Sequence, residues 1–273
     1  IILLFGLLAG VKYVVDLGDK IEHSGYTFNN EFGSDSQDSQ AMTPGTNARM
    51  TTQKLSSSAI SYAIELPYGN ISIMPTGQDD AYVEYSSDCD IEVQTREDAG
   101  YLRLNVKMPK NISKLFHIDE NDVKINFYLP KDELEKLSID MKAGYLKVYD
   151  MKAYKFSLEM AAGNAVVKGC VFEEITTDLN AGNLDLYTDV ITKHIDSEVA
   201  AGNMRLMLPE DITGFLIKYK VDLGNLSNKL SFNIYDSSKG YAISKSGELS
   251  YGDKSCKIDL DVAIGNISLN EYK

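Results

Sequence analysis

The sequence contains no tryptophan and only three histidines and three cysteines among its 273 residues. The cysteines, Cys89, Cys170 and Cys256, are odd in number and far apart, and they form neither a CxxC pair nor another metal-binding spacing. We therefore predict no metal site and interpret all three as packed or idle thiols. A Cys89–Cys256 disulfide stays an open alternative, because spacing alone does not decide it.

Positive charge is also scarce. The chain has 27 lysines and arginines against 40 aspartates and glutamates, which gives a formal net charge of −13. Proteins that bind DNA or RNA cluster Lys and Arg against the phosphates, so this balance argues against a nucleic-acid partner. Together with 17 tyrosines, the composition is that of an acidic, soluble body.

The common catalytic and cofactor motifs are missing as well. The sequence has no GxSxG, SxxK, P-loop, HExxH or EF-hand pattern. His23, His117 and His194 fall in a predicted tether, a loop and a coil corner, where histidine is usually a solvated turn residue. We therefore predict no catalytic residue, no cofactor and a non-enzymatic protein. A polysaccharide-active enzyme built on a β-helix is a less favoured alternative, since it requires clustered acid and base residues.

The chain does contain a ten-residue motif that occurs four times. Residues 139–148 read IDMKAGYLKV, and the later copies read LEMAAGNAVV (158–167), TDLNAGNLDL (177–186) and SEVAAGNMRL (197–206). The glycines of the four copies lie 19, 19 and 20 residues apart, and weaker copies surround Gly69, Gly224 and Gly265. A fixed period near 20 residues is typical of a solenoid.

Each copy alternates apolar and polar residues on both sides of its glycine. This period of two predicts two short strands joined by a bend, each with one face turned inward. Glycine fits the bend because a sharp corner often needs a positive φ. The asparagine that usually follows can bond the next asparagine in a stack. We predict a structural corner ladder made of Asn164, Asn183, Asn203 and Asn225.

A single coil cannot bury its inner face, so the coils must stack in parallel register. The sequence therefore predicts an all-β fold, a single-stranded parallel β-solenoid (β-helix) with about 19–22 residues per coil and irregular N-terminal coils. The general rule for parallel crossovers favours a right-handed coil. Terminal coils are expected to be atypical because they cap the open ends of the stack. Further strands are expected over residues 59–66, 70–74, 81–85, 91–94, 101–107 and 123–129.

The N-terminal part differs in character from the repeats. Residues 1–15 are apolar apart from Lys12, and as a helix they would span about 22 Å, less than the roughly 30 Å hydrocarbon core. They are interpreted as part of a membrane anchor, with the apolar region of a signal peptide as the alternative. Residues 16–58 are predicted to be a polar, largely disordered tether. Residues 59–273 form the β-solenoid domain, which we place outside the cytoplasmic membrane.

Two short stretches carry a resemblance to a known family. Residues 125–130 read INFYLP and residues 137–139 read LSI, and glycine then recurs every 19 to 20 residues between alternating strands. This order resembles a bacterial family of unknown function called putative adhesins, over about residues 60–270. The resemblance implies a surface protein with a β-solenoid body, often behind an N-terminal membrane segment. It implies no catalytic residues.

One column of the predicted stack is acidic. The position four residues before the corner glycine is held by Asp140, Glu159, Asp178 and Glu198 in successive coils. Neighbouring coils lie about 4.8 Å apart, so these carboxylates form a candidate acidic interaction face. A solvated surface is the simpler interpretation. A functional one is a strip for a cationic protein or peptide, which fits better than Ca²⁺, since calcium needs ligands converging from several directions.

Two functions follow from these features. The first is a non-enzymatic, adhesin-like binding protein at the cell surface, held on a membrane tether, whose partner is a protein, peptide or glycan of the cell envelope. The second is an envelope-stress accessory or sensor protein that binds cationic peptides or a membrane partner through the acidic face.

Overall fold

The computed structural model of the chain describes residues 50–56, 58–77, 80–86, 91–107, 123–240 and 244–273. These residues belong to a compact unit that spans residues 48–273. The predicted anchor, most of the predicted tether, Cys89, His23 and His117 lie outside the described residues. Within the described ranges, no helix has the length and apolar character needed to cross a membrane.

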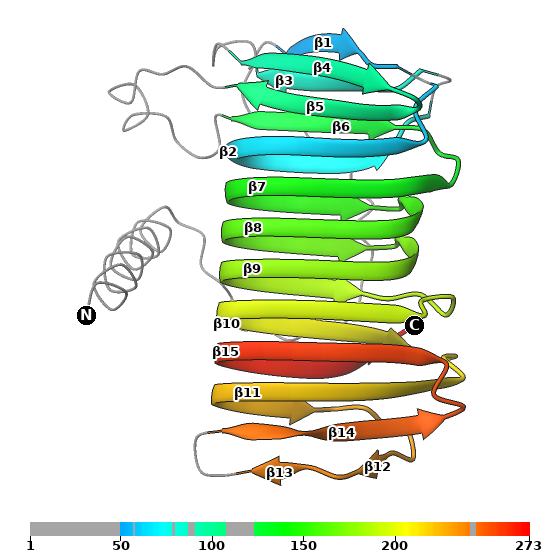
Figure 1. Cartoon of the computed structure of the whole chain (residues 1–273), viewed down its shortest axis with the longest axis vertical. Coiled ribbons are helices and arrows are strands. Elements are labelled where there is room, and N and C mark those ends of the chain that lie inside the picture. Colours follow the sequence, from blue (N-terminus) through cyan, green and yellow to red (C-terminus); the bar gives the residue numbers. More distant parts are fainter. Residues whose placement is uncertain (1–49, 57, 78–79, 87–90, 108–122, 241–243) are drawn as a thin grey trace, which may run out of the picture. The chain divides into compact units, whose positions relative to one another are not determined.

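The described part of the chain is built from fifteen β-strands that belong to one sheet (Figure 1). Along the sheet the strands follow the order β1-β3-β6-β2-β7-β8-β9-β10-β15-β11-β14-β12, with β4 and β5 beside β2 and β13 beside β14. The strands are β1 (Met50–Lys54), β2 (Ser61–Pro75), β3 (Tyr82–Ser86), β4 (Glu92–Asp98), β5 (Tyr101–Lys107), β6 (Lys124–Leu129), β7 (Leu134–Tyr149), β8 (Lys152–Lys168), β9 (Val171–Tyr187), β10 (His194–Pro209), β11 (Gly214–Asn228), β12 (Tyr235–Asp236), β13 (Lys239–Gly240), β14 (Lys245–Gly252) and β15 (Cys256–Tyr272).

Each repeat forms one long strand that bends at its glycine, where two short strands were expected. Figure 1 shows β7 to β10 as a series of such bent strands. Gly182 has φ +131°, and a Cβ added to it would lie 1.6 Å from the carbonyl oxygen of Gly163 in the coil before. The corner therefore needs glycine for two reasons, the backbone angle and the close approach of the neighbouring coil.

The bent strands pair in parallel with their repeats in register. Gly144 pairs with Gly163, Gly163 with Gly182, and Gly182 with Gly202. The offset between paired residues therefore equals the period of the sequence. The predicted all-β fold with stacked parallel coils is confirmed.

The two arms of each bent strand enclose a single hydrophobic core. The side chains that point inward come from alternate positions on both arms, as the period of two predicts. Burying an aliphatic side chain of this kind stabilises the fold by roughly 1.5–3 kcal/mol. In β7 the buried residues are Leu134, Leu137, Ile139, Met141, Leu146 and Val148. Between coils, the rings of Phe156 and Phe172 stack with centroids 4.7 Å apart.

The order of the last coils differs from a simple sequential stack. β15 lies between β10 and β11 and pairs in parallel with both. The chain leaves β11, forms the short strands β12 and β13, and returns as β14, which is antiparallel to β11. The predicted ladder places Asn225 directly after Asn203, whereas the coil around Gly265 lies between the coils around Gly202 and Gly224.

Short antiparallel strands occupy both ends of the stack. At one end β1 pairs with β3, and β3 with β6; at the other, β12 and β13 pair with β14. Such strands keep the open edges of a sheet from pairing with other chains. β1 also lies within the stretch expected to be a tether, and Leu55 is buried in the core. The folded unit thus begins before Ser58.

Candidate functional site

The two arms of the coils present two outer faces to solvent. The arm before the corner glycine carries the acidic column on its outer side, and the arm after it carries the asparagine ladder. Both arms turn their inner side chains to one core, so their outer side chains point away from that core. Each outer position recurs from coil to coil in straight columns.

The four expected carboxylates do lie side by side. Asp140 pairs with Glu159, Glu159 with Asp178, and Asp178 with Glu198, and all four are exposed. The structure adds Glu65 at one end, in β2, and Asp261 at the other, in β15. The six residues of this acidic column are Glu65, Asp140, Glu159, Asp178, Glu198 and Asp261.

One end of the acidic column is closed by a hydrogen-bond donor and the other by a lysine. Asn105 donates its side-chain amide to Glu65 at 2.8 Å. The Lys220 ammonium lies 3.6 Å from Asp261 and 2.9 Å from Asp222. Between these ends, neighbouring unit charges about 4.8 Å apart in water repel by under about 1 kcal/mol. The fold therefore tolerates the column, and solvent screens it.

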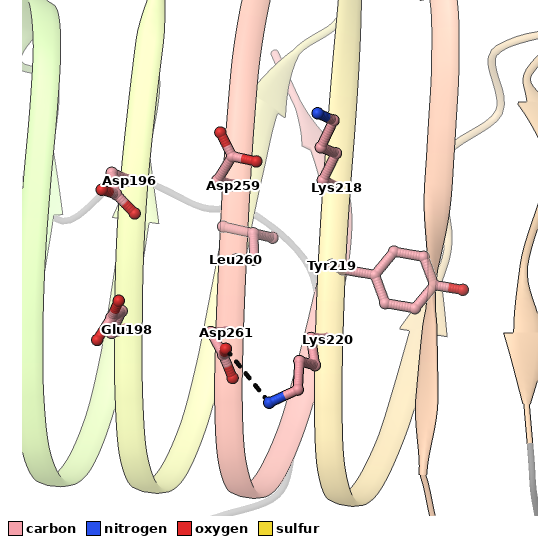
Figure 2. Close-up of a pocket in the computed structure, with 8 residues that line it drawn as sticks. All are labelled: Asp196, Glu198, Lys218, Tyr219, Lys220, Asp259, Leu260 and Asp261. Atoms are coloured by element: carbon pink, nitrogen blue, oxygen red, sulfur yellow. Dashed lines mark ion pairs between the residues drawn. The ribbon is translucent and has the colours of Figure 1, made fainter.

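A second acidic column runs beside the first at its β15 end. Figure 2 shows Asp196 beside Glu198 on β10 and Asp259 beside Asp261 on β15, with lysines on the next strand, β11. These side chains line an open depression of about 260 Å³, whose lining residues are Asp196, Glu198, Lys218, Tyr219, Lys220, Asp259, Leu260 and Asp261. The Tyr219 side chain points away from the carboxylates, and its hydroxyl donates to the Ser238 hydroxyl at 2.7 Å.

The carboxylates form straight columns and do not converge. Among the residues that the structure describes, no three His, Cys, Asp or Glu side chains come close enough to hold a metal ion. An extended positive ligand could contact several carboxylates at once by lying along the column. That arrangement suits a basic peptide better than a single small cation.

The asparagine ladder runs through a residue that sequence reasoning did not include. Asn183 donates its amide to Asn164 at 2.7 Å, and Asn203 donates to Asn183 at 2.9 Å. The next member is Asn266, which donates to Asn203 at 2.8 Å. Asn225 follows it and donates its backbone N–H to Asn266 at 3.2 Å. The ladder connects the corners of five coils.

On the same arm, an ion pair joins two coils. Arg205 Nε lies 3.5 Å from Asp185 Oδ1, and both side chains are about one-third exposed. Partial burial raises the pKa of Asp185, and the charge of Arg205 opposes that rise.

Elsewhere, Cys170 and Cys256 are buried free thiols, and burial raises the pKa of each to about 12. His194 is exposed at the start of β10.

Stacked parallel coils with repeated outer columns define a β-repeat protein. The family is shown by sequence: the profile of the Toastrack DUF4097 family matches residues 62–270. The chain belongs to this family, which confirms the resemblance inferred from the repeat. No curated protein matches the chain.

Three solved structures are similar to this chain at low sequence identity. A putative cell adhesion protein from Clostridium sporogenes is 14% identical, with a TM-score of 0.48 over 82% of this chain and 99% of that chain. A putative adhesin from Bacteroides fragilis is 10% identical, with a TM-score of 0.40 over 82% and 98%. A putative lipid binding protein from Parabacteroides distasonis is 15% identical, with a TM-score of 0.29 over 83% and 98%.

Proposed function

We propose that this protein is a non-enzymatic, adhesin-like binding module of the bacterial cell surface. The observation that supports this is the repetition of the same outer side-chain positions in register over successive coils. Repetition of this kind gives an extended partner many equivalent contacts along one line. The family resemblance, which implies a surface protein, supports the same function. The predicted N-terminal membrane segment would hold the module outside the cytoplasmic membrane.

A second candidate is an envelope-stress sensor or accessory protein that binds cationic peptides. The observation that favours it is the acidic column, with six carboxylates in register and exposed to varying degrees. Electrostatic complementarity of this type speeds association and depends on salt. Lys218 and Lys220 lie at one end of the column. Their positive charges would repel a basic peptide and so limit how far it extends along the column.

The test is the binding of an octa-arginine peptide to the purified chain, measured by calorimetry at several salt concentrations. The column variant carries Asp140→Asn, Glu159→Gln, Asp178→Asn and Glu198→Gln. The control variant carries Glu133→Gln, Asp150→Asn, Glu210→Gln and Asp211→Asn, which are exposed positions between strands. Each variant changes the net charge from −13 to −9, since four negative charges are removed.

We expect the column variant to bind at least tenfold more weakly than the control variant, with a smaller dependence on salt. Equal binding by the two variants would show that only net charge matters, and the sensor function would be abandoned. The binding-module proposal would then depend on the opposite face. Turnover of a bound envelope polymer by the purified chain would contradict the non-enzymatic part of the proposal.

A further inference from the structure

Five tyrosines line the outer side of the opposite face, the arm that follows the corner glycine. We call them the tyrosine ribbon: Tyr82, Tyr128, Tyr149, Tyr187 and Tyr272. They belong to five different strands, β3, β6, β7, β9 and β15. Each is partly exposed, whereas neighbouring residues that point inward are buried: Phe127 and Leu129 beside Tyr128, Val148 before Tyr149, and Leu186 and Thr188 beside Tyr187.

The first part of the ribbon lies at the β1 end of the stack. Tyr82 and Tyr128 are register partners, and their rings stack with centroids 4.4 Å apart and planes 15° from parallel. Tyr128 is paired on its other side with Met74 of β2. Burial and the nearby Glu84 raise the pKa of Tyr128 to about 12, so its hydroxyl is protonated at neutral pH.

The second part continues the line over the regular coils. Tyr149 is the register partner of Lys168, whose ammonium lies 5.1 Å from the ring centroid of Tyr187. The ring of Tyr187 meets that of Tyr272 edge to face, with centroids 5.4 Å apart. The Tyr272 hydroxyl donates to the backbone carbonyl of Thr188. These contacts orient the rings of Tyr187 and Tyr272.

The charge of this face differs from that of the acidic column. Lys147 and Lys168 lie on it, and each is placed over a tyrosine ring at 5.1 Å, Lys147 over Tyr145 and Lys168 over Tyr187. Within the described ranges, neither lysine has a carboxylate at ion-pair distance. Asp185, on the same arm, is paired with Arg205. Further carboxylates lie near the ends of the ribbon strands: Glu84 near Tyr128, Asp150 beside Tyr149, and Asp189 and Asp211 near Tyr272. Positive charge on this face is therefore concentrated at Lys147 and Lys168, in the middle of the ribbon, on a chain of net charge −13.

The spacing of the rings points to a periodic ligand. Tyr149 and Tyr187 are two coils apart, which corresponds to roughly 10 Å along the stack. Tyrosine offers a large, rigid contact surface at low entropic cost, with a polar hydroxyl at its tip. The C–H faces of pyranose rings are the apolar surfaces that stack on such side chains, and an extended chain of sugars repeats along one line, as the ribbon does.

We propose that the tyrosine ribbon binds an extended, acidic, linear polysaccharide that lies along the stack of coils. Its pyranose rings pack on Tyr149 and Tyr187, and its carboxylates are held by Lys147 and Lys168. This assignment rests on the proposed function, a non-enzymatic binding module, and specifies one of its faces and the class of its ligand. The acidic column, on the other arm, would repel the same polymer.

The test is affinity electrophoresis of the purified chain in gels that contain polygalacturonate, with hydroxyethylcellulose as a neutral polymer and poly-L-proline as a peptide probe. The ribbon variant is Tyr149→Ala with Tyr187→Ala. Its matched control is Tyr154→Ala with Tyr235→Ala, which removes two tyrosines that are 41% and 73% exposed elsewhere. A third variant, Lys147→Gln with Lys168→Gln, removes only the charges.

We expect polygalacturonate to retard the native chain and the control variant equally. The ribbon variant and the lysine variant should each bind at least tenfold more weakly, and Tyr187→Phe should bind like the native chain because the ring is kept. Thermal unfolding followed by circular dichroism identifies a variant that fails to fold. The lysine variant, whose side chains are outside the core, tests the proposal even if the ribbon variant unfolds.

Four results would overturn the assignment: no retardation by polygalacturonate, equal retardation of the lysine variant, equal loss in the control variant, or retardation by hydroxyethylcellulose or poly-L-proline alone. If octa-arginine still binds in any of these cases, the ribbon assignment fails, and a non-enzymatic binding module that acts through the acidic column stands. If the chain binds polygalacturonate through the ribbon but also shortens it, the site assignment stands and the non-enzymatic function fails.

Discussion

Asn266 donates its side-chain amide to Asn203 at 2.8 Å, although the two residues are 63 positions apart in the sequence. This contact exists because β15 is inserted between β10 and β11. The asparagine ladder therefore crosses the point at which the order of coils in space departs from their order in the chain.

Replacing Asn266 tests the ladder at that point. In Asn266→Ala, Asn203 loses its donor and the backbone N–H of Asn225 loses its acceptor. Because water can reach this exposed corner, we expect a loss of about 1 kcal/mol in the free energy of unfolding. Urea unfolding measures it. Asn270→Ala, on the same strand but outside the ladder, should cost less; an equal cost would argue against a ladder contribution.

Gly182→Ala should damage the stack severely. The new Cβ would lie 1.6 Å from the carbonyl oxygen of Gly163, at a φ of +131°. Backbone strain and the displaced coil together should cost at least about 3 kcal/mol. The control is Gly77→Ala, where a Cβ meets nothing within 4 Å. Urea unfolding of both variants should show a large loss only for Gly182→Ala, and a small loss there would contradict the close contact between coils.

Neutralising one member of the acidic column should stabilise the fold. Glu159 lies between Asp140 and Asp178, and each neighbour repels it by under about 1 kcal/mol. Glu159→Gln should therefore raise the free energy of unfolding by roughly 0.5–1 kcal/mol at low salt, and the gain should vanish near 1 M salt. Glu133→Gln provides the control in a turn. Destabilisation by Glu159→Gln at low salt would reveal a favourable contact of this carboxylate.

Asp185 should make stability depend on pH. Its folded pKa is raised, chiefly by burial, above the ordinary value of 3.8. Between the ordinary and the raised pKa the folded state holds more protons than the unfolded state, so the free energy of unfolding falls as pH rises through that window. Asp185→Asn should remove this part of the pH dependence. The free energy of unfolding of the variant, relative to that of the native chain, should therefore be higher at pH 7 than at pH 3.5. The opposite order in urea unfolding would mean that the Arg205 pair outweighs burial.

Much of the fold was predictable because a coil is a local structure. The glycine, the alternating pattern and the 19- to 20-residue period belong to single coils and their neighbours, and they yield both the parallel register and the four central members of the acidic column. The position of β15 was not predictable from the same signal. Gly265 lies 41 residues after Gly224, a distance that fits two further coils as well as a returning strand.

The tyrosine ribbon escaped sequence reasoning for a different reason. Tyr149 and Tyr187 hold the same position in their coils, five residues after the glycine, but Lys168 and Met207 hold it in the coils beside them. Tyr82 and Tyr128 come from strands without the regular period. Only the pairing of β3 with β6, and of β6 with β2, brings these residues into one line with the regular coils.

The insertion of β15 also governs the order in which the protein can be completed. During synthesis, β11 to β14 emerge before β15, the strand that joins them to β10. The coils up to β10 and the strands β11 to β14 can therefore be joined only after β15 has been made. A chain interrupted before Cys256 leaves two unpaired parallel edges, whereas an interruption in a sequential solenoid would cost only the last coil. An incomplete molecule would therefore expose strand edges that can pair with other chains, and the continuous faces described above need β15 in place.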